Sequence, residues 1–76
     1  MDEFMMQYKK HQMFKSLRYW GELMKEYADR RQYDLVSYYE GMICGTIDTM
    51  HSLHMITLQT YFNLNHLLNN KRDQLY

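Results

Sequence analysis

The sequence predicts an all-α protein that folds as an antiparallel hairpin of two long helices, over about residues 2–30 and 34–70. The first observation is compositional: the chain has no proline, three glycines and few Val or Ile residues, so helix breakers and strand formers are both scarce. The second is that apolar residues recur at helical spacing in both halves of the chain. The third is a short polar segment between the two patterns, because a connection of that length forces consecutive helices antiparallel.

The first predicted helix has one apolar stripe and one charged face. An α-helix turns by about 100° per residue, so residues can be assigned to a face by position. The apolar stripe, with Met5 and Leu23 at its margin, consists of Met6, Met13, Leu17, Trp20, Met24, Tyr27 and Ala28. The opposite face consists of His11, Lys15, Arg18, Glu22, Lys25, Glu26 and Asp29. This pattern is typical of a helix that buries one side against a partner element.

The connection between the two helices is predicted in the segment from Arg30 to Asp34. Arg30 and Arg31 lie where the negative end of the first helix dipole favours cations. Asp34 is a good N-cap residue, since its side-chain oxygen can accept a hydrogen bond from the free amides of the next helix.

The second predicted helix keeps its apolar phase from Leu35 to Asn70, which favours one continuous helix. Gly45 and the segment 48–51 are the places where this helix could bend or break. Gly41 and Gly45 also form a stripe of small residues, which is either an exposed polar face or a site of close helix–helix contact.

The second predicted helix is longer than the first, so its last two turns lack a covering element. These turns carry Phe62, Leu64, Leu67 and Leu68, and need either a fold-back or a partner. A chain of 76 residues is near the lower size limit for folding alone. We therefore predict a single domain over residues 1–76 that forms a homodimer through these four residues, giving a four-helix bundle. Residues 71–76 are predicted to form a frayed tail.

Cysteine usage and the first residues favour a cytoplasmic protein. Cys44 is the only cysteine, so no disulfide can form within the chain. The start Met1-Asp2-Glu3 is acidic, whereas a secretory leader begins with basic residues. Polar residues such as Asp48 and Gln59 interrupt the apolar runs, so no membrane span is expected.

Cys44, Asp48 and His51 share one face of the second predicted helix, at spacings i, i+4 and i+7. His, Cys and Asp are metal ligands, and His66 could join them. One helix face rarely closes a tetrahedral site, so we expect polar surface residues here and neither metal nor cofactor. The sequence also lacks a phosphate-binding glycine loop and a nucleophile with a base, so no enzymatic activity is expected.

The candidate partner-binding residues lie outside the core stripe of the first helix: Tyr8, Phe14, Lys15, Arg18 and Tyr19. Aromatic and arginine side chains are the usual anchors of protein interfaces. The eight methionines and eight tyrosines either fill a helical core or contribute to a binding surface. The leading interpretation is a small regulator or inhibitor that binds another protein. The alternatives are RNA or DNA binding by this basic and aromatic face, disfavoured by a net charge of zero, and a structural subunit of a larger assembly.

Residues 27–41, with the sequence YADRRQYDLVSYYEG, look like the inter-helix turn of a tetratricopeptide-type hairpin. The glycine of such a turn and a second repeat are absent. The YYEG segment also resembles the opening of the second helix in short helical-hairpin proteins of Gram-positive phages and mobile elements. That resemblance assigns no functional residue. It implies a phage or mobile-element context, with a host protein such as a defence or replication factor as partner.

Overall fold

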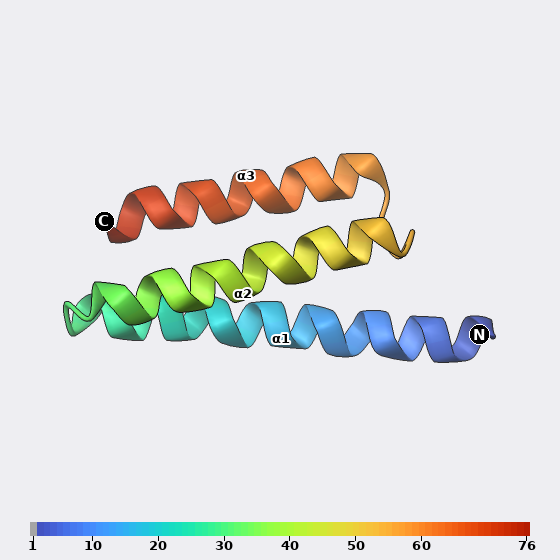
Figure 1. The fold of residues 1–76 in the computed structure, drawn as a ribbon, viewed down its shortest axis with the longest axis horizontal. Coiled ribbons are helices and arrows are strands. Elements are labelled where there is room, and N and C mark those ends of the chain that lie inside the picture. Colours follow the sequence, from blue (N-terminus) through green and yellow to red (C-terminus); the bar gives the residue numbers. More distant parts are fainter. Residues whose placement is uncertain (1) are drawn as a thin grey trace.

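The computed structural model describes residues 2–76, and within that range the chain forms three helices and no strand (Figure 1). α1 spans Glu3–Asp29, α2 spans Tyr33–Ser52 and α3 spans Leu58–Leu75. The prediction of an all-α fold is confirmed. The prediction of one continuous helix over residues 34–70 is wrong, because a connection over residues 53–57 divides it into α2 and α3. Among the described residues, no helix is both long enough and apolar enough to cross a membrane.

The connection between α1 and α2 contains a residue in the left-handed backbone conformation. Arg31 has a φ of 59°, and the amide of Gln32 donates to the carbonyl of Tyr27 at 2.9 Å. This is the Schellman arrangement, which provides donors for carbonyls at the end of a helix. Helical conformation resumes directly after Gln32, so the prediction that Asp34 is the N-cap is wrong. Asp34 lies in the first turn of α2, where the helix dipole still favours its charge.

The connection between α2 and α3 uses the same device. His54 has a φ of 58°, and the amide of Met55 donates to the carbonyl of Met50 at 2.8 Å. Both methionines are buried, which supplies the apolar contact that accompanies a Schellman motif. Thr57 then caps α3, because its hydroxyl oxygen accepts from the amide of Thr60 at 3.1 Å. These local hydrogen bonds make the sharp reversal possible without glycine or proline.

α2 lies between the other two helices, and the chain runs along the molecule, back and along again (Figure 1). α1 and α3 are therefore parallel to each other, and each packs mainly on α2. The molecule is elongated and thin, with extents of 43 × 20 × 13 Å. α1 is the longest helix and its N-terminal turns extend past the α2–α3 connection (Figure 1).

The hydrophobic core combines residues from every helix and from the second connection. Its buried members are Met24, Val36, Ile43, Ile47, Met50, Met55, Ile56 and Leu68. Half-buried residues of α1 that pack against it include Met6, Met13, Leu17, Trp20, Tyr27 and Ala28. These are members of the apolar stripe that the sequence predicts for the first helix, so the periodicity identified the buried side of α1 correctly.

The fold-back of α3 changes the position of the four residues predicted to mediate self-association. Leu68 is buried in the core of the same chain, and Leu64 is half-buried against it. Phe62 and Leu67 are exposed, at 57% and 62%. The sequence predicts that the end of a longer second helix is left uncovered. This is wrong, because the segment that carries these residues is α3, which packs on α2 of the same chain.

Polar contacts hold the C-terminal half of α3 against α2. The hydroxyl groups of Tyr76 and Ser37 are hydrogen-bonded at 2.8 Å, and the Tyr76 ring lies 5.6 Å from the Tyr33 ring. The Arg72 guanidinium is 4.0 Å from the carboxylate of Glu40. Residues 71–76, for which the sequence predicts a frayed tail, thus continue α3 to Leu75 and contact the start of α2.

Candidate interaction surface

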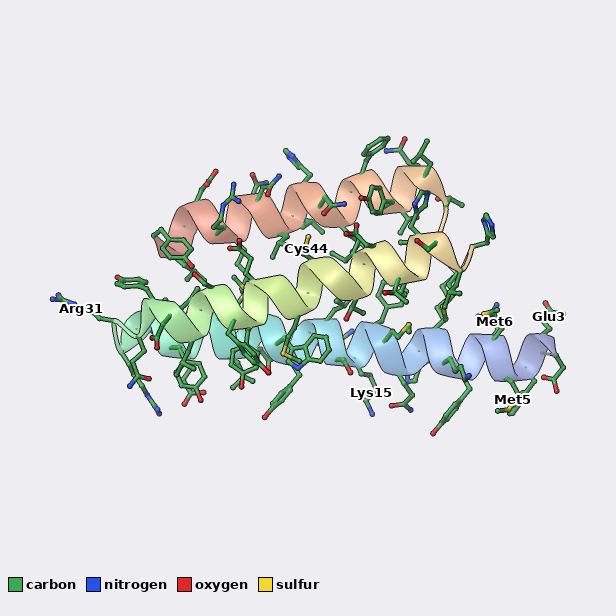
Figure 2. All side chains as sticks on the ribbon, in the orientation of Figure 1. Glu3, Met5, Met6, Lys15, Arg31 and Cys44 are labelled. Carbon is green, nitrogen blue, oxygen red and sulfur yellow. The ribbon has the colours of Figure 1, made fainter. Side chains whose placement is uncertain are left out.

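The five residues predicted to bind a partner do not form one surface. Tyr8 and Tyr19 are exposed, at 56% and 60%, whereas Phe14 is half-buried against the core. Residues six positions apart on a helix are separated by about 120° around its axis, which places Tyr8 and Phe14 on different flanks of α1. Lys15 points away from α2 and α3 (Figure 2), and Arg18 is also exposed.

Tyr19 belongs instead to a cluster of tyrosines that spans α1 and α2. The rings of Tyr27 and Tyr39 are stacked, with centroids 5.8 Å apart and an interplanar angle of 4°. Tyr38 meets Tyr39 edge-on, with centroids 5.1 Å apart and an angle of 83°. Tyr19 and Tyr38 are each 60% exposed at the margins of this group. We call these four residues the tyrosine face: Tyr19, Tyr27, Tyr38 and Tyr39.

The electrostatic surroundings of Tyr39 reflect this clustering. Loss of solvation raises the pKa of the Tyr39 hydroxyl above its ordinary value of 10.0, and the neighbouring Tyr27, Tyr38 and Tyr19 raise it further. The Arg30 guanidinium lies over the Tyr27 ring, 5.9 Å from its centroid, and is paired with Glu26 at 2.7 Å. The Tyr39 hydroxyl therefore stays protonated at neutral pH and can donate a hydrogen bond to a partner.

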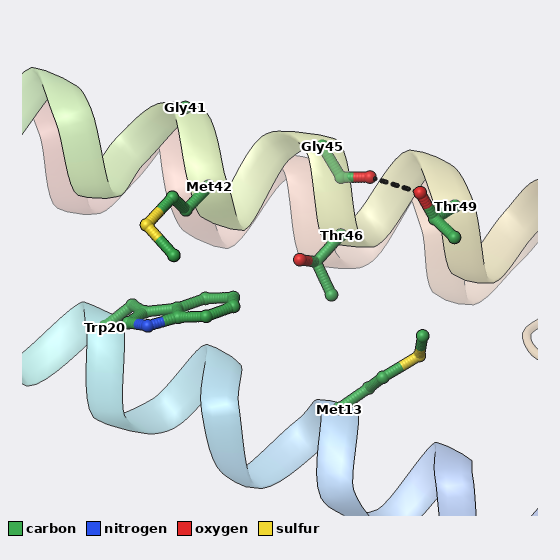
Figure 3. A pocket seen from close by; sticks show the side chains of 7 residues that line it. All are labelled: Met13, Trp20, Gly41, Met42, Gly45, Thr46 and Thr49. Carbon is green, nitrogen blue, oxygen red and sulfur yellow. Dashed lines mark hydrogen bonds between the residues drawn. The ribbon is translucent and has the colours of Figure 1, made fainter.

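An open cleft lies between α1 and α2, beside the tyrosine face (Figure 3). Its volume is about 380 Å³, and its lining consists of Met13, Trp20, Gly41, Met42, Gly45, Thr46 and Thr49. The Trp20 ring lies opposite Met42 across the cleft (Figure 3). Apart from the adjoining residues and nearby backbone of α2 itself, no described atom lies within 4 Å of where a Cβ would stand on Gly41 or Gly45, so the two glycines border open space.

Sequence reasoning missed the tyrosine face because it assigned each helix separately. Tyr27 belongs to the apolar stripe predicted for the first helix, whereas Tyr39 lies in the second predicted helix. In an antiparallel hairpin, residues equally distant from the turn lie opposite each other, and Tyr27 and Tyr39 are equally distant from Tyr33. The register of the two helices about the predicted turn therefore predicts that Tyr27 and Tyr39 lie opposite each other.

Cys44, Asp48 and His51 lie on the side of α2 that faces α3 (Figure 2 labels Cys44). The hydroxyl of Tyr61 donates to the Asp48 carboxylate at 2.8 Å. His51 stacks on the same Tyr61 ring, with centroids 4.5 Å apart and an angle of 27°. The hydrogen bond to Asp48 raises the pKa of Tyr61 above 10.0, and the negative charge of Asp48 adds to this effect. These contacts join α2 to α3.

Within the described residues, no three His, Cys, Asp or Glu side chains are grouped so that they could hold a metal ion. Cys44 is a free, exposed thiol, and His66 is exposed on α3. Asp48 and His51 contact Tyr61 as part of the packing of α2 against α3.

Comparison of this chain with protein-family models, with curated proteins and with solved structures finds no match.

Proposed function

We propose that this protein is a non-enzymatic interaction module that binds another protein through the tyrosine face and the adjoining Trp20 cleft. The observation that carries the proposal is the partial exposure of packed aromatic rings. Tyr38 is 60% exposed although it packs edge-on against Tyr39 of the stacked pair, and Tyr19, also 60% exposed, lies near enough to raise the pKa of Tyr39. Tyr, Trp and Met are enriched at protein interfaces, and Tyr and Trp dominate their binding energy.

Rigidity favours this face over the isolated aromatic residues at the start of α1. A stacked or edge-on ring has already lost much of its side-chain freedom, so binding costs it little further entropy. Phe4 and Tyr8 are 78% and 56% exposed, and they lie in the first two turns of α1. The tyrosine face offers aromatic area, hydroxyl donors and an adjacent hollow at one place, which is what a protein hot spot requires.

The resemblance of the YYEG segment supports a host protein as the partner of a phage or mobile-element regulator. Tyr38 and Tyr39 are the two tyrosines of that segment and are also members of the tyrosine face. The exposed thiol of Cys44 fits the reducing conditions of the cytoplasm. The function is then to block or redirect that host protein by occupying its surface. Homodimerisation stays a separate prediction.

Affinity capture from the source cell, using the full chain and variants, tests this proposal. The double substitution Tyr19→Ala with Tyr38→Ala is expected to reduce recovery of the captured protein at least tenfold, because it removes two anchor residues. Phe62→Ala is the matched control, since Phe62 is similarly exposed but lies on α3. Circular dichroism establishes that each variant is folded.

An oligonucleotide-binding experiment distinguishes the alternative function, RNA or DNA binding, from the proposed protein binding. Fluorescence anisotropy with single-stranded RNA and DNA at low ionic strength is expected to show no binding. Binding that is lost with Lys15→Glu plus Arg18→Glu would replace the proposal with the nucleic-acid function. Capture that is equal for the wild type and for the tyrosine double variant would exclude the tyrosine face as the contact surface.

A further inference from the structure

α1 and α3 face each other across an apolar groove. Two hollows, of about 410 and 140 Å³, lie along it. On α1 their lining residues are Lys10, Phe14, Leu17 and Gly21, which follow the spacing i, i+4, i+7, i+11 of a single helix stripe. The two hollows are therefore parts of one groove, about three helical turns or ~16 Å long.

The opposite wall repeats this pattern on α3. Its lining residues are Thr60, Leu64, Leu67 and Lys71, again at i, i+4, i+7 and i+11. Because α1 and α3 run parallel, the two walls are in register from one end of the groove to the other. We call this feature the α1–α3 groove. Residues at these spacings on two neighbouring helices are those that receive the side chains of a further helix in a bundle.

The wall of the groove on α3 leaves apolar surface uncovered, whereas the floor belongs to the buried core. Ile43 and Ile47 of α2 form part of the floor. Leu67 is 62% exposed on the wall. α1 and α3 contact each other little, although Lys71 Cε lies 3.6 Å from where a Cβ would stand on Gly21. The chain exposes 5532 Å² in total, compared with roughly 5,000 Å² for a compact monomer of this mass.

The charge of the α1–α3 groove is positive at both ends. Lys10 marks one end and Lys71 the other, and none of the described residues that line it is acidic. Arg18, four residues after Phe14, flanks the same edge of α1. A complementary occupant therefore carries acidic residues about 11 positions apart, with aliphatic residues between them.

No helix of this chain carries two acidic residues 11 positions apart, so a second copy does not offer such a helix. The exposed apolar residues at the free start of α1, Phe4 and Tyr8, are followed by Lys9 and Lys10, which repel the lysines of the groove. α3 exposes Leu58 and Phe62 near its start, with a single acid, Asp73, near its end. Charge complementarity thus favours a different protein.

We propose that the α1–α3 groove binds one amphipathic helix of another protein, with aliphatic residues on one face and an acidic residue near each end of it. The bound helix completes a four-helix bundle and covers Leu67. This surface lies between α1 and α3, whereas the Trp20 cleft lies between α1 and α2, so the two sites can be occupied independently.

The test uses two fluorescein-labelled helical peptides of about 18 residues with the full-length protein. Both carry leucines at i, i+4 and i+7, and they differ only in having Glu or Lys at the two ends of that stripe. Fluorescence anisotropy is expected to give a dissociation constant on the order of 10–100 μM for the acidic-ended peptide. The basic-ended peptide is expected to bind at least tenfold more weakly. Equal affinities, or no binding of the acidic-ended peptide at about 1 mM, would overturn the proposal.

Matched variants assign the binding to the groove. Leu67→Asn is expected to weaken binding of the acidic-ended peptide roughly tenfold. Leu58→Asn is expected to leave that binding unchanged, because Leu58 is similarly exposed, at 55%, but lies outside the groove. Gly21→Leu fills the groove and abolishes binding, while Gly21→Ala retains it because its methyl group meets only the flexible end of Lys71. Lys10→Glu with Lys71→Glu reverses the preference between the two peptides. Equal effects of Leu58→Asn and Leu67→Asn would contradict the assignment.

Light scattering with the same variants distinguishes a second copy from a different protein. If the wild type is a dimer and Leu67→Asn makes it a monomer, the groove is occupied by another copy of this chain and the proposal is wrong. Leu67→Asn is expected to leave capture through the tyrosine face unchanged. Failure of the peptide experiment therefore does not affect the proposed function, and failure of the capture experiment does not affect the groove.

Discussion

Replacing His54 with glycine is expected to stabilise the protein, because His54 has a left-handed backbone conformation with a φ of 58°. A side chain in that conformation brings its Cβ close to the following carbonyl oxygen, which costs roughly 1–2 kcal/mol. Glycine has no Cβ and adopts the conformation freely, but it also gives the unfolded chain more freedom, which costs about 0.4–1 kcal/mol. His54 is exposed, so little packing is lost. The net expectation is a gain of roughly 0.5–1 kcal/mol in the free energy of unfolding.

The sign of this change discriminates between the two folds that the sequence allows. If residues 34–70 formed one continuous helix, His54 would lie in its interior, and glycine there would lower the free energy of unfolding by several tenths of a kcal/mol. His66→Gly is the matched control, because His66 is exposed in the interior of α3. It is expected to destabilise the protein while His54→Gly stabilises it.

Urea denaturation followed by circular dichroism measures both variants against the wild type. A gain of 0.5–1 kcal/mol corresponds to a rise of roughly 2–8 °C in the midpoint of thermal unfolding for a domain of this size. Unchanged denaturant slopes are required for the comparison, since a changed slope means that the compactness of one state has changed. A loss of stability in His54→Gly that equals the loss in His66→Gly would refute the break over residues 53–57.

Gly45→Ala is expected to raise the free energy of unfolding by about 1 kcal/mol, because Gly45 lies inside α2 and a methyl group there meets open space; a changed oligomeric state in light scattering would instead indicate a helix contact at this glycine. Leu68→Ala is expected to lower the free energy of unfolding, measured by urea denaturation, by about 2–5 kcal/mol. This loss is expected to be the same at every protein concentration, because Leu68 is buried within its own chain. Leu67→Ala changes the free energy by less than about 0.5 kcal/mol, and equal losses would contradict the different burial of the two leucines. The raised pKa of Tyr61 means that the folded state holds the hydroxyl proton more tightly than the unfolded state does. The stability that Tyr61 contributes is therefore fully present below pH 10 and is lost as the pH rises through the pKa of the folded state. Denaturation at a series of alkaline pH values is expected to show a shallower loss of stability in Tyr61→Phe than in the wild type.

The break between α2 and α3 left little trace in the sequence. No glycine or proline lies in residues 53–57, and the apolar phase of the second helix continues through them. The positions expected to break the helix, Gly45 and residues 48–51, stay inside α2. The reversal depends on His54 in a left-handed conformation and on the Thr57 cap, neither of which is distinctive by residue type.

The candidate surfaces also depended on contacts between helices. Exposed Tyr19 could be identified from its position outside the stripe, but its neighbours Tyr38 and Tyr39 belong to another helix. Phe14 was expected beside Tyr19, yet it lines the α1–α3 groove. The groove exists only because α3 folds back parallel to α1, and a continuous second helix would not have formed it.

The sequence by itself determined the helical class, the buried stripe of α1 and the first reversal of the chain, because composition and periodicity act within one helix and over neighbouring residues. Tertiary structure decided that the second half folds back as α3, and so it decided which leucines are buried and which are exposed. Burial of Met55, Ile56 and Leu68 against α2 is a property of three packed segments. The apolar area that they remove from water stabilises the fold-back, including the strained backbone at His54.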